Sequence, residues 1–489
     1  MKKFIKCVLS VALVFVIAFS VTGCKKKISS TTTDTDKVMS VDGKSTNGGT
    51  TVVYDGYLYF INGTKTNDGT NAKDNVRGAV YRVSYDEETG KIGSKYEAVV
   101  KDLVGYENGS LYFFGNFMYY TTPSADVNYK GDTLYYKTKF MRYDLVNKKS
   151  HEIYTTKQNS SDEAMSYAYY VVGDSLNLVV YESTSSTITS LRIGNEIKTN
   201  YTIKDVKSCI MSENNGTCVT EGKTTDANNY VFYTKAHDEE DRIQTGVKVY
   251  RVSPASNNSY LIANNGEDIS LLSIRNGKLI YSANENIYAQ AITGANTDVI
   301  GEDNMSKTIS YETFDNVIFV ENKDGSISVL YYYADKDKSI YQMGIVDCKN
   351  GINPVNTLIT SLNKSEAFEL VGTTIISEVI TEDDEETTDV DETVKQNVQY
   401  VIYIDTKQVY KLEIAREVEG EMVYSRYTEP IKLSTTEVVS ASGLLTAEVI
   451  GTNLYIMAAV DGDNYMHTID LTIDEEATIK KATMIGVEE

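Results

Sequence analysis

The stretch Asp55-Gly56-Tyr57-Leu58-Tyr59-Phe60 joins a two-residue turn signal to a short run of aromatic and aliphatic residues. Asp-Gly favours a tight β-hairpin turn because both residues tolerate positive φ. Tyr, Leu and Phe in such a run favour an extended strand. This turn-and-strand unit occurs eight times, with copies beginning at Asp55, Asn108, Gly173, Asn228, Asn276, Asp315, Val371 and Gly451. The sequence therefore predicts a β-protein built by repetition.

A second unit follows each copy and gives independent evidence for the repeat. It is an apolar residue, usually Tyr, then a polar or basic residue, as in Val80-Tyr81-Arg82-Val83. Its copies begin at Val80, Phe140, Ser190, Val249, Ile287, Ile340, Val409 and Tyr465. They recur about every 55 residues. Apolar runs such as Thr51–Tyr54 before the pair and Glu97–Val100 after it predict a first and a fourth strand.

Four short strands per repeat are typical of a β-propeller blade. Each small sheet would be apolar on both faces, so it can bury them only between neighbouring sheets. We predict an all-β fold in which residues 50–489 form a β-propeller of eight four-stranded blades. Seven blades result if the copies near Leu191 and Asn229 share one irregular blade. No stretch keeps helical spacing over about 12 residues.

The pairing of a Leu-Tyr-Phe strand with a following Ile-Tyr-Arg strand resembles the YWTD-type propellers of lipoprotein-receptor ectodomains. It is more similar to the tyrosine-rich propeller lipoproteins of low-GC Gram-positive bacteria. The resemblance covers residues 50–480 as a repeat pattern. The Trp and Asp of the YWTD motif are missing, so receptor-type contacts are not implied. Most members of the bacterial family have no assigned activity, so the resemblance implies a fold and a location only.

Residues 1–23 have the composition of an export signal. Lys2, Lys3 and Lys6 form a positive region, and an apolar region follows from Val8 to Phe19. About a dozen apolar residues are too few to span a bilayer, which needs about 20. A cleaved signal peptide therefore fits better than a permanent membrane helix.

The apolar region ends in Val21-Thr22-Gly23-Cys24. This sequence resembles the lipobox of bacterial lipoproteins, which ends in an obligatory cysteine whose thiol takes up diacylglycerol. The resemblance implies signal cleavage between Gly23 and Cys24 and lipid attachment at Cys24. Two or three acyl chains give a stable anchor, whereas a single chain gives a marginal one.

The segment 24–49 begins with the lipidated Cys24 and continues with lysines and then Ser, Thr, Asp and Gly. Such a composition cannot bury a core and predicts a flexible tether. Lys25, Lys26 and Lys27 are expected to lie against acidic headgroups. The expected location is the extracytoplasmic face of the cell membrane, reached through the lipid on Cys24. The Gram type of the host stays open.

The net charge of −22 disfavours nucleic-acid partners and acidic polymers, because an acidic surface repels phosphate backbones. Cys209 and Cys218 flank the turn signal Asn214-Asn215-Gly216, so a local disulfide is one alternative and free thiols are the other. Cys348 follows a predicted strand, with no local feature that favours a thiolate.

The three histidines, His151, His237 and His467, lie in different repeats, whereas a zinc site needs two or three together. His467 falls in the predicted third strand of its repeat. The acidic segment from Glu382 to Glu392 could gather Ca²⁺, but it lacks the spacing and the glycine of an EF-hand, so a solvated insertion is favoured. Short acidic turns at 335–337 and 461–463 are interpreted as turn chemistry.

These patterns contain no recognised catalytic, metal-binding or cofactor-binding motif. We expect no cofactor, with calcium as the one exception to test. The favoured function is a non-enzymatic, monomeric propeller that binds a protein or glycan ligand outside the cell. The alternative is an extracellular polysaccharide hydrolase or lyase, which would need two carboxylates about 5–10 Å apart. The sequence does not place such a pair.

Overall fold

The computed structural model describes most of the chain from residue 50 to residue 485. The described ranges are 50–61, 78–104, 111–130, 133–159, 165–173, 175–211, 218–219, 226–236, 247–266, 269–275, 277–283, 286–291, 305–310, 316–321, 327–335, 340–347, 355–363, 369–381, 393–405, 407–425, 427–433, 439–440, 446–460, 463–472 and 483–485.

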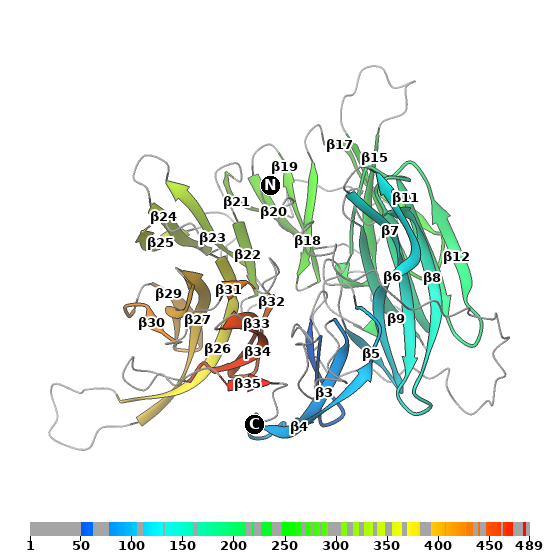
Figure 1. Ribbon diagram of the computed structural model, residues 1–489. Helices are drawn as coiled ribbons and strands as arrows, with labels where there is room; N and C mark the ends of the chain where they lie inside the picture. Colours follow the sequence, from blue (N-terminus) through cyan, green and yellow to red (C-terminus); the bar gives the residue numbers. More distant parts are fainter. Residues whose placement is uncertain are drawn as a thin grey trace, which may run out of the picture.

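Eight β-sheets lie in the described part of the chain, and we number them in chain order (Figure 1). Sheets 1 and 2 consist of β1 (Thr51–Tyr54), β2 (Tyr57–Ile61), β3 (Val80–Tyr85) and β4 (Ile92–Val100), then β5 (Tyr112–Phe114), β6 (Phe117–Lys130), β7 (Thr133–Asp144) and β8 (Lys149–Asn159). Sheets 3 and 4 consist of β9 (Ser166–Val172), β10 (Ser175–Glu182), β11 (Thr187–Ile193), β12 (Lys198–Ile203) and β14 (Cys218–Val219), then β13 (Ser208–Ile210), β15 (Val231–Ala236), β16 (Val247–Val252) and β17 (Ser259–Gly266).

Sheets 5 and 6 consist of β18 (Ser270–Arg275), β19 (Lys278–Ala283), β20 (Asn286–Ala291) and β21 (Met305–Ser310), then β22 (Asn316–Glu321), β23 (Ile327–Asp335), β24 (Ile340–Asp347) and β25 (Val355–Asn363). Sheet 7 consists of β26 (Glu369–Thr381), β27 (Thr393–Asp405), β28 (Gln408–Val418), β29 (Glu421–Tyr424) and β30 (Ile431–Lys432). Sheet 8 consists of β31 (Val439–Ser440), β32 (Thr446–Ile450), β33 (Asn453–Val460), β34 (Asp463–Asp470) and β35 (Thr483–Ile485).

Each sheet is an antiparallel meander made from consecutive strands of the chain. The exception is β14, which follows β13 of sheet 4 but pairs in parallel with β9 of sheet 3. A 3-10 helix, Ala227–Asn229, precedes β15. The prediction of an all-β chain with four-stranded repeats is confirmed, whereas the number of blades stays a prediction. Leu191 and Asn229, which the seven-blade alternative places in one blade, belong to β11 of sheet 3 and to the 3-10 helix before β15 of sheet 4.

The quoted stretch forms the hairpin that begins sheet 1. Asp55 and Gly56 have φ values of +49° and +72°, and Tyr54 pairs with Tyr57 across the two-residue turn. Positive φ at both central residues is the turn that matches the twist of a hairpin. Most residues of β1 and β2 are buried on both faces of the sheet. Such a sheet is stable only between two other sheets.

Among the described side chains, shared apolar clusters join all neighbouring sheets in chain order except sheets 5 and 6. One cluster joins sheets 1 and 2 and also includes Ile450 and Tyr455 of sheet 8. Further clusters join sheets 2 and 3, sheets 3 and 4, sheets 4 and 5, sheets 6 and 7, and sheets 7 and 8. In sheet 6 the described side chain is Leu330, which packs on sheet 7. The last sheet therefore packs on the first, as a propeller requires.

The predicted second unit lies in the third strand of all eight sheets. The first unit is correctly placed, in the second strand, in five sheets. The copies at Asn108 and Asp315 instead lead into β5 and β22, and Val371 lies inside β26, all first strands of their sheets. These three assignments were wrong because a turn signal precedes a first strand as readily as a second one.

The basic residue of the third strand makes the same contact in four sheets. It lies over an aromatic ring two residues before its own pairing partner on the second strand. The four pairs are Arg82 over Tyr57 (4.3 Å from cation to ring centroid), Arg142 over Phe117 (4.8 Å), Arg251 over Tyr230 (4.7 Å) and Lys411 over Tyr400 (4.5 Å). Diagonal cross-strand neighbours are within reach of such long side chains.

The third strand also donates hydrogen bonds to the next sheet, where a backbone carbonyl just beyond the third strand accepts them. The three bonds are Arg142 Nη1 to Gly194 O (3.2 Å), Ser190 Oγ to Pro254 O (2.5 Å) and Lys411 Nζ to Leu471 O (2.8 Å). At Arg142 and Lys411 one side chain thus both packs on a ring of its own sheet and bonds to the next sheet, whereas Ser190 lies two residues before the basic residue of its unit.

Candidate functional site

The predicted signal and anchor lie outside the described residues. This applies to the cleavage site between Gly23 and Cys24, to the lipid attachment at Cys24 and to the tether that ends at residue 49. They stay predictions. Within the described ranges, no helix has the length and apolar content needed to cross a membrane.

The structure keeps the two described histidines apart. His151 lies on β8 opposite Arg142, and burial together with that cation lowers the pKa of its imidazole. His467 is 1% exposed on β34, the third strand of sheet 8, as expected. His237 lies outside the described residues. No group of three or more His, Cys, Asp or Glu side chains is arranged to hold a metal ion among the residues described.

Of the two alternatives left open for Cys209 and Cys218, the structure supports the free thiol at Cys209, because the two cysteines do not face each other across a hairpin. Cys209 lies on β13 and pairs with Tyr233 of sheet 4, whereas Cys218 lies on β14 beside Val171 of sheet 3. Cys209 is a free cysteine, and burial raises the pKa of its thiol. The two strands therefore do not pair with each other, because each finds its partner in a different sheet.

The remaining predicted features lie at the ends of strands or outside the described residues. Cys348 follows the end of β24 and lies outside the described residues. The acidic segment Glu382–Glu392 also lies outside them, between β26 and β27, so its calcium site stays a prediction. Asp335 is the last residue of β23 and Asp463 the first of β34, whereas 336–337 and 461–462 lie outside the described residues, so the turn interpretation stays a prediction.

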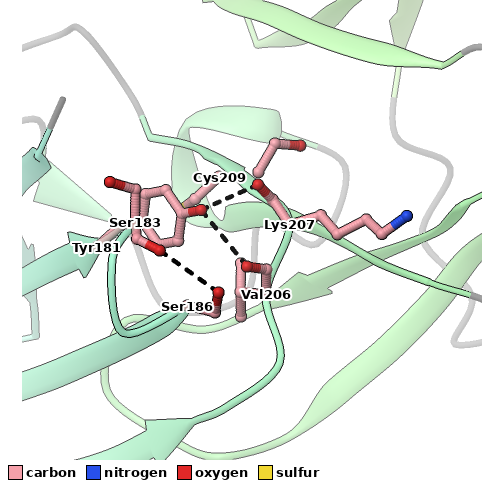
Figure 2. Close-up of a pocket in the computed structure, with 7 residues that line it drawn as sticks. Tyr181, Ser183, Ser186, Val206, Lys207 and Cys209 are labelled. Carbon is pink, nitrogen blue, oxygen red and sulfur yellow. Dashed lines mark hydrogen bonds between the residues drawn. The ribbon is translucent and has the colours of Figure 1, made fainter. Parts of the chain in front are cut away.

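A pocket of about 610 Å³ lies where sheet 3 meets sheet 4 (Figure 2). The lining residues are Tyr181, Ser183, Ser186, Val206, Lys207, Ser208 and Cys209. Tyr181 is the next-to-last residue of β10, and Ser183 and Ser186 lie in the turn between β10 and β11. The other lining residues lie on the connection from β12 into β13.

Hydrogen bonds from Tyr181 of sheet 3 to the β12–β13 connection, and a bond within sheet 4, fix the walls of this pocket. The Tyr181 hydroxyl donates to the carbonyl oxygens of Lys207 (2.9 Å) and Val206 (3.4 Å), as Figure 2 shows. The Ser208 and Thr234 hydroxyls are bonded to each other at 2.6 Å. The backbone of the pocket is therefore held before any ligand arrives.

The pocket offers polar groups to a ligand. The Ser183 Oγ is buried and has no hydrogen-bond partner among the described residues. The side chain of Lys207 is exposed at the rim. A buried hydroxyl without a partner loses the hydrogen bonds it would make in water, so a ligand that bonds to it restores them. The pocket suits a ligand that carries hydroxyl, carbonyl or other oxygen groups.

Sequence reasoning did not find this pocket. The Ser-Thr-Ser-Ser run at 183–186 reads as an ordinary turn, and Val206 and Lys207 carry no motif. The two segments come together only because sheets 3 and 4 pack face to face. Cys209 was singled out, but for a disulfide.

No family model matches the chain, and no curated protein matches it. Among solved structures, it is similar to the WD40 domain of SCAP from fission yeast, with 11% identity and a TM-score of 0.38, over 89% of this chain and 96% of that one. It is also similar to the Dos1 propeller, with 10% identity and a TM-score of 0.39, over 91% and 98%. A eukaryotic initiation factor gives 9% identity and a TM-score of 0.39, over 91% and 87%. At this level the likeness does not extend to activity or ligand.

Proposed function

We propose that this chain is a lipoprotein, anchored through Cys24 to the extracytoplasmic face of a membrane, whose propeller binds a protein or glycan ligand without transforming it. The observation that carries the location is the run Val21-Thr22-Gly23-Cys24 at the end of an apolar segment that is too short to span a bilayer. The binding role is supported by the face-to-face packing of the sheets and by the polar groups of the pocket between sheets 3 and 4.

Lipid labelling tests the anchor. The Cys24→Ala variant should incorporate no radioactive fatty acid and should collect as uncleaved precursor or in the medium. Cys7→Ala is the matched control, because Cys7 leaves with the signal peptide and its loss should not change labelling. Equal labelling of Cys24→Ala and the wild-type chain would remove the basis for the proposed location.

The ligand that fits best is a neutral glycan or an uncharged stretch of protein surface. The net charge of −22 opposes binding of acidic polymers. The Ser183 hydroxyl and the Lys207 amine can donate hydrogen bonds to the hydroxyl oxygens of a sugar or to peptide carbonyls.

An array of neutral oligosaccharides tests this part of the proposal. Binding by the wild-type chain should fall about tenfold in Lys207→Ala, which loses one hydrogen bond or more to the ligand. Lys204→Ala is the matched control, since Lys204 is exposed on the same β12–β13 connection and does not line the pocket. Equal losses in both variants would show a general effect of charge and would contradict binding in the pocket.

A search for reaction products distinguishes binding from hydrolysis. Incubation with cell-wall and plant polysaccharides should produce no new reducing ends and no unsaturated sugar products. Turnover would replace the binding role by the polysaccharide hydrolase or lyase that the sequence left as the alternative.

A further inference from the structure

Sheets 1 and 8 meet at an interface that differs from the others in the ring. Ile450 and Tyr455 of sheet 8 pack into the cluster that contains Val52 and Leu58 of sheet 1. Tyr85 of sheet 1 packs against the same cluster. We call this interface the seam. It buries apolar surface as the other interfaces do, so it is part of the core and not an incidental contact.

At the other interfaces, the chain itself passes from one sheet to the next. At the seam it does not, because sheet 1 contains the first described strands and sheet 8 the last. Among the described strands, none of sheet 1 pairs with a strand of sheet 8. No shared backbone ladder therefore reinforces the seam in the described part of the chain, and side-chain contacts hold it.

A hydrogen bond from a main-chain N–H to a carboxylate crosses the seam. The backbone N–H of Thr50 donates to Glu448 Oε1 at 2.9 Å. Thr50 is 3% exposed, and Glu448 lies on β32 of sheet 8. The bond therefore links the residue that precedes β1 to the other end of the fold. A buried N–H that loses its acceptor costs free energy, so this contact favours the closed seam.

A close counterpart exists where the chain does link the sheets. Glu182 of sheet 3 accepts a hydrogen bond from the backbone N–H of Lys157 of sheet 2 at 2.5 Å. The two carboxylates thus make the same kind of contact, but only the one at Glu448 joins sheets that the chain does not connect. The comparison separates the effect of the hydrogen bond from the effect of chain continuity.

We propose that the seam is a latch, at which the ring opens while sheets 2 to 7 stay folded, and that the Glu448 carboxylate holds it closed. Once the seam is open, sheets 1 and 8 are each packed on one face only, so their strand pairs open more readily than those of sheets 2 to 7. The local free energy of opening is then lower at the seam than elsewhere, as expected for a unit that moves separately.

Hydrogen exchange on the full-length protein, kept in solution by a mild detergent, tests the latch. In Glu448→Ala, amide exchange should rise about tenfold or more, and together, in the segments around β1, β2, β32 and β33, because a hydrogen bond to a charged acceptor is lost. In Glu182→Ala, exchange should not rise selectively in the seam segments, because Glu182 bonds sheet 3 to sheet 2. Glu448→Gln keeps an acceptor oxygen and should restore most of the protection at the seam.

Two results would overturn the latch. One is a rise in Glu448→Ala that is equal across all eight sheets, which would show global destabilisation. The other is exchange at β1 and β33 that does not change, which would show that the carboxylate does not hold the seam. Neither result depends on the lipid anchor or on the ligand. The latch can therefore fail while the proposed function stands, and the proposed function can fail while the latch stands.

Discussion

Glu182 provides the sharpest test of how neighbouring sheets are held together. Its carboxylate is 1% exposed at the end of β10 and accepts hydrogen bonds from the Tyr154 hydroxyl (2.9 Å) and the Lys157 backbone N–H (2.5 Å), both on β8 of sheet 2. Burial and the nearby Glu182 charge raise the pKa of Tyr154, which therefore donates as a neutral phenol. Removing the carboxylate leaves both donors without this acceptor.

A hydrogen bond to a charged group contributes about 1.5–3 kcal/mol, so Glu182→Ala should lower the free energy of unfolding by about 3–5 kcal/mol. Tyr154→Phe removes one bond and should cost about 1–2 kcal/mol. Glu152 on the same strand is the control: its carboxylate is 49% exposed and pairs with Lys139, so Glu152→Gln should cost less than about 1 kcal/mol.

Urea denaturation of the four chains of a Tyr154 and Glu182 double-mutant cycle measures the coupling. We expect a coupling free energy of about 1–3 kcal/mol. Faster amide exchange at Lys157 should accompany the loss of Glu182. The reasoning is refuted if Tyr154→Phe costs the same with and without Glu182, or if Glu182→Ala costs no more than Glu152→Gln.

Three further predictions concern the repeat, acid stability and the free thiol. Arg142→Met should lower the free energy of unfolding by about 1–3 kcal/mol, because it loses the contact with the Phe117 ring and the hydrogen bond to a carbonyl of the next sheet. The control is Arg192→Met at an exposed position of that next sheet, which should cost under about 0.5 kcal/mol. Equal costs of the two substitutions in urea denaturation would show that the repeated contact does not stabilise the fold. Desolvation raises the pKa of Asp144, but hydrogen bonds from Asn147 and Val146 outweigh it and lower the pKa below 3.8. As pH falls, the unfolded state therefore binds the proton first, so the stabilisation is present above the unfolded pKa and is lost as pH falls through the folded pKa. Asp144→Asn should therefore reduce the fall of the melting temperature at acid pH. An unchanged fall would contradict this. Because burial raises the pKa of Cys209, iodoacetamide should label its thiol far more slowly in the folded chain than in urea at pH 8, and equal rates would place that thiol in solvent.

The sequence predicted the position of a strand well where a residue had a fixed partner in three dimensions. The basic residue of the second unit lies in the third strand of each sheet that carries it, and in four of these sheets it lies over an aromatic ring of the neighbouring segment. Arg82 and Tyr57 are 25 positions apart in the chain yet form one cross-strand pair. A turn signal has no such partner, so Asn108 and Asp315 could not reveal which strand they precede.

The contacts between sheets could not be predicted in the same way. Cys209 and Cys218 looked like neighbours across a hairpin, but each pairs with a different sheet. The pocket at Ser183 and Lys207 depends on which faces of sheets 3 and 4 meet, and this is a property of packing that no local pattern records. Glu448 carried no signal either, because its partner Thr50 lies 398 positions away.

Each sheet is drawn from one uninterrupted run of the chain, with β14 as the exception. The unit of folding therefore coincides with the unit of sequence duplication, so a whole repeat could be gained or lost without cutting a strand pair. For the same reason, new termini placed in a loop between two sheets, with the old ends joined by a linker across the seam, would give circular permutants that keep the described hydrogen-bonded ladders intact.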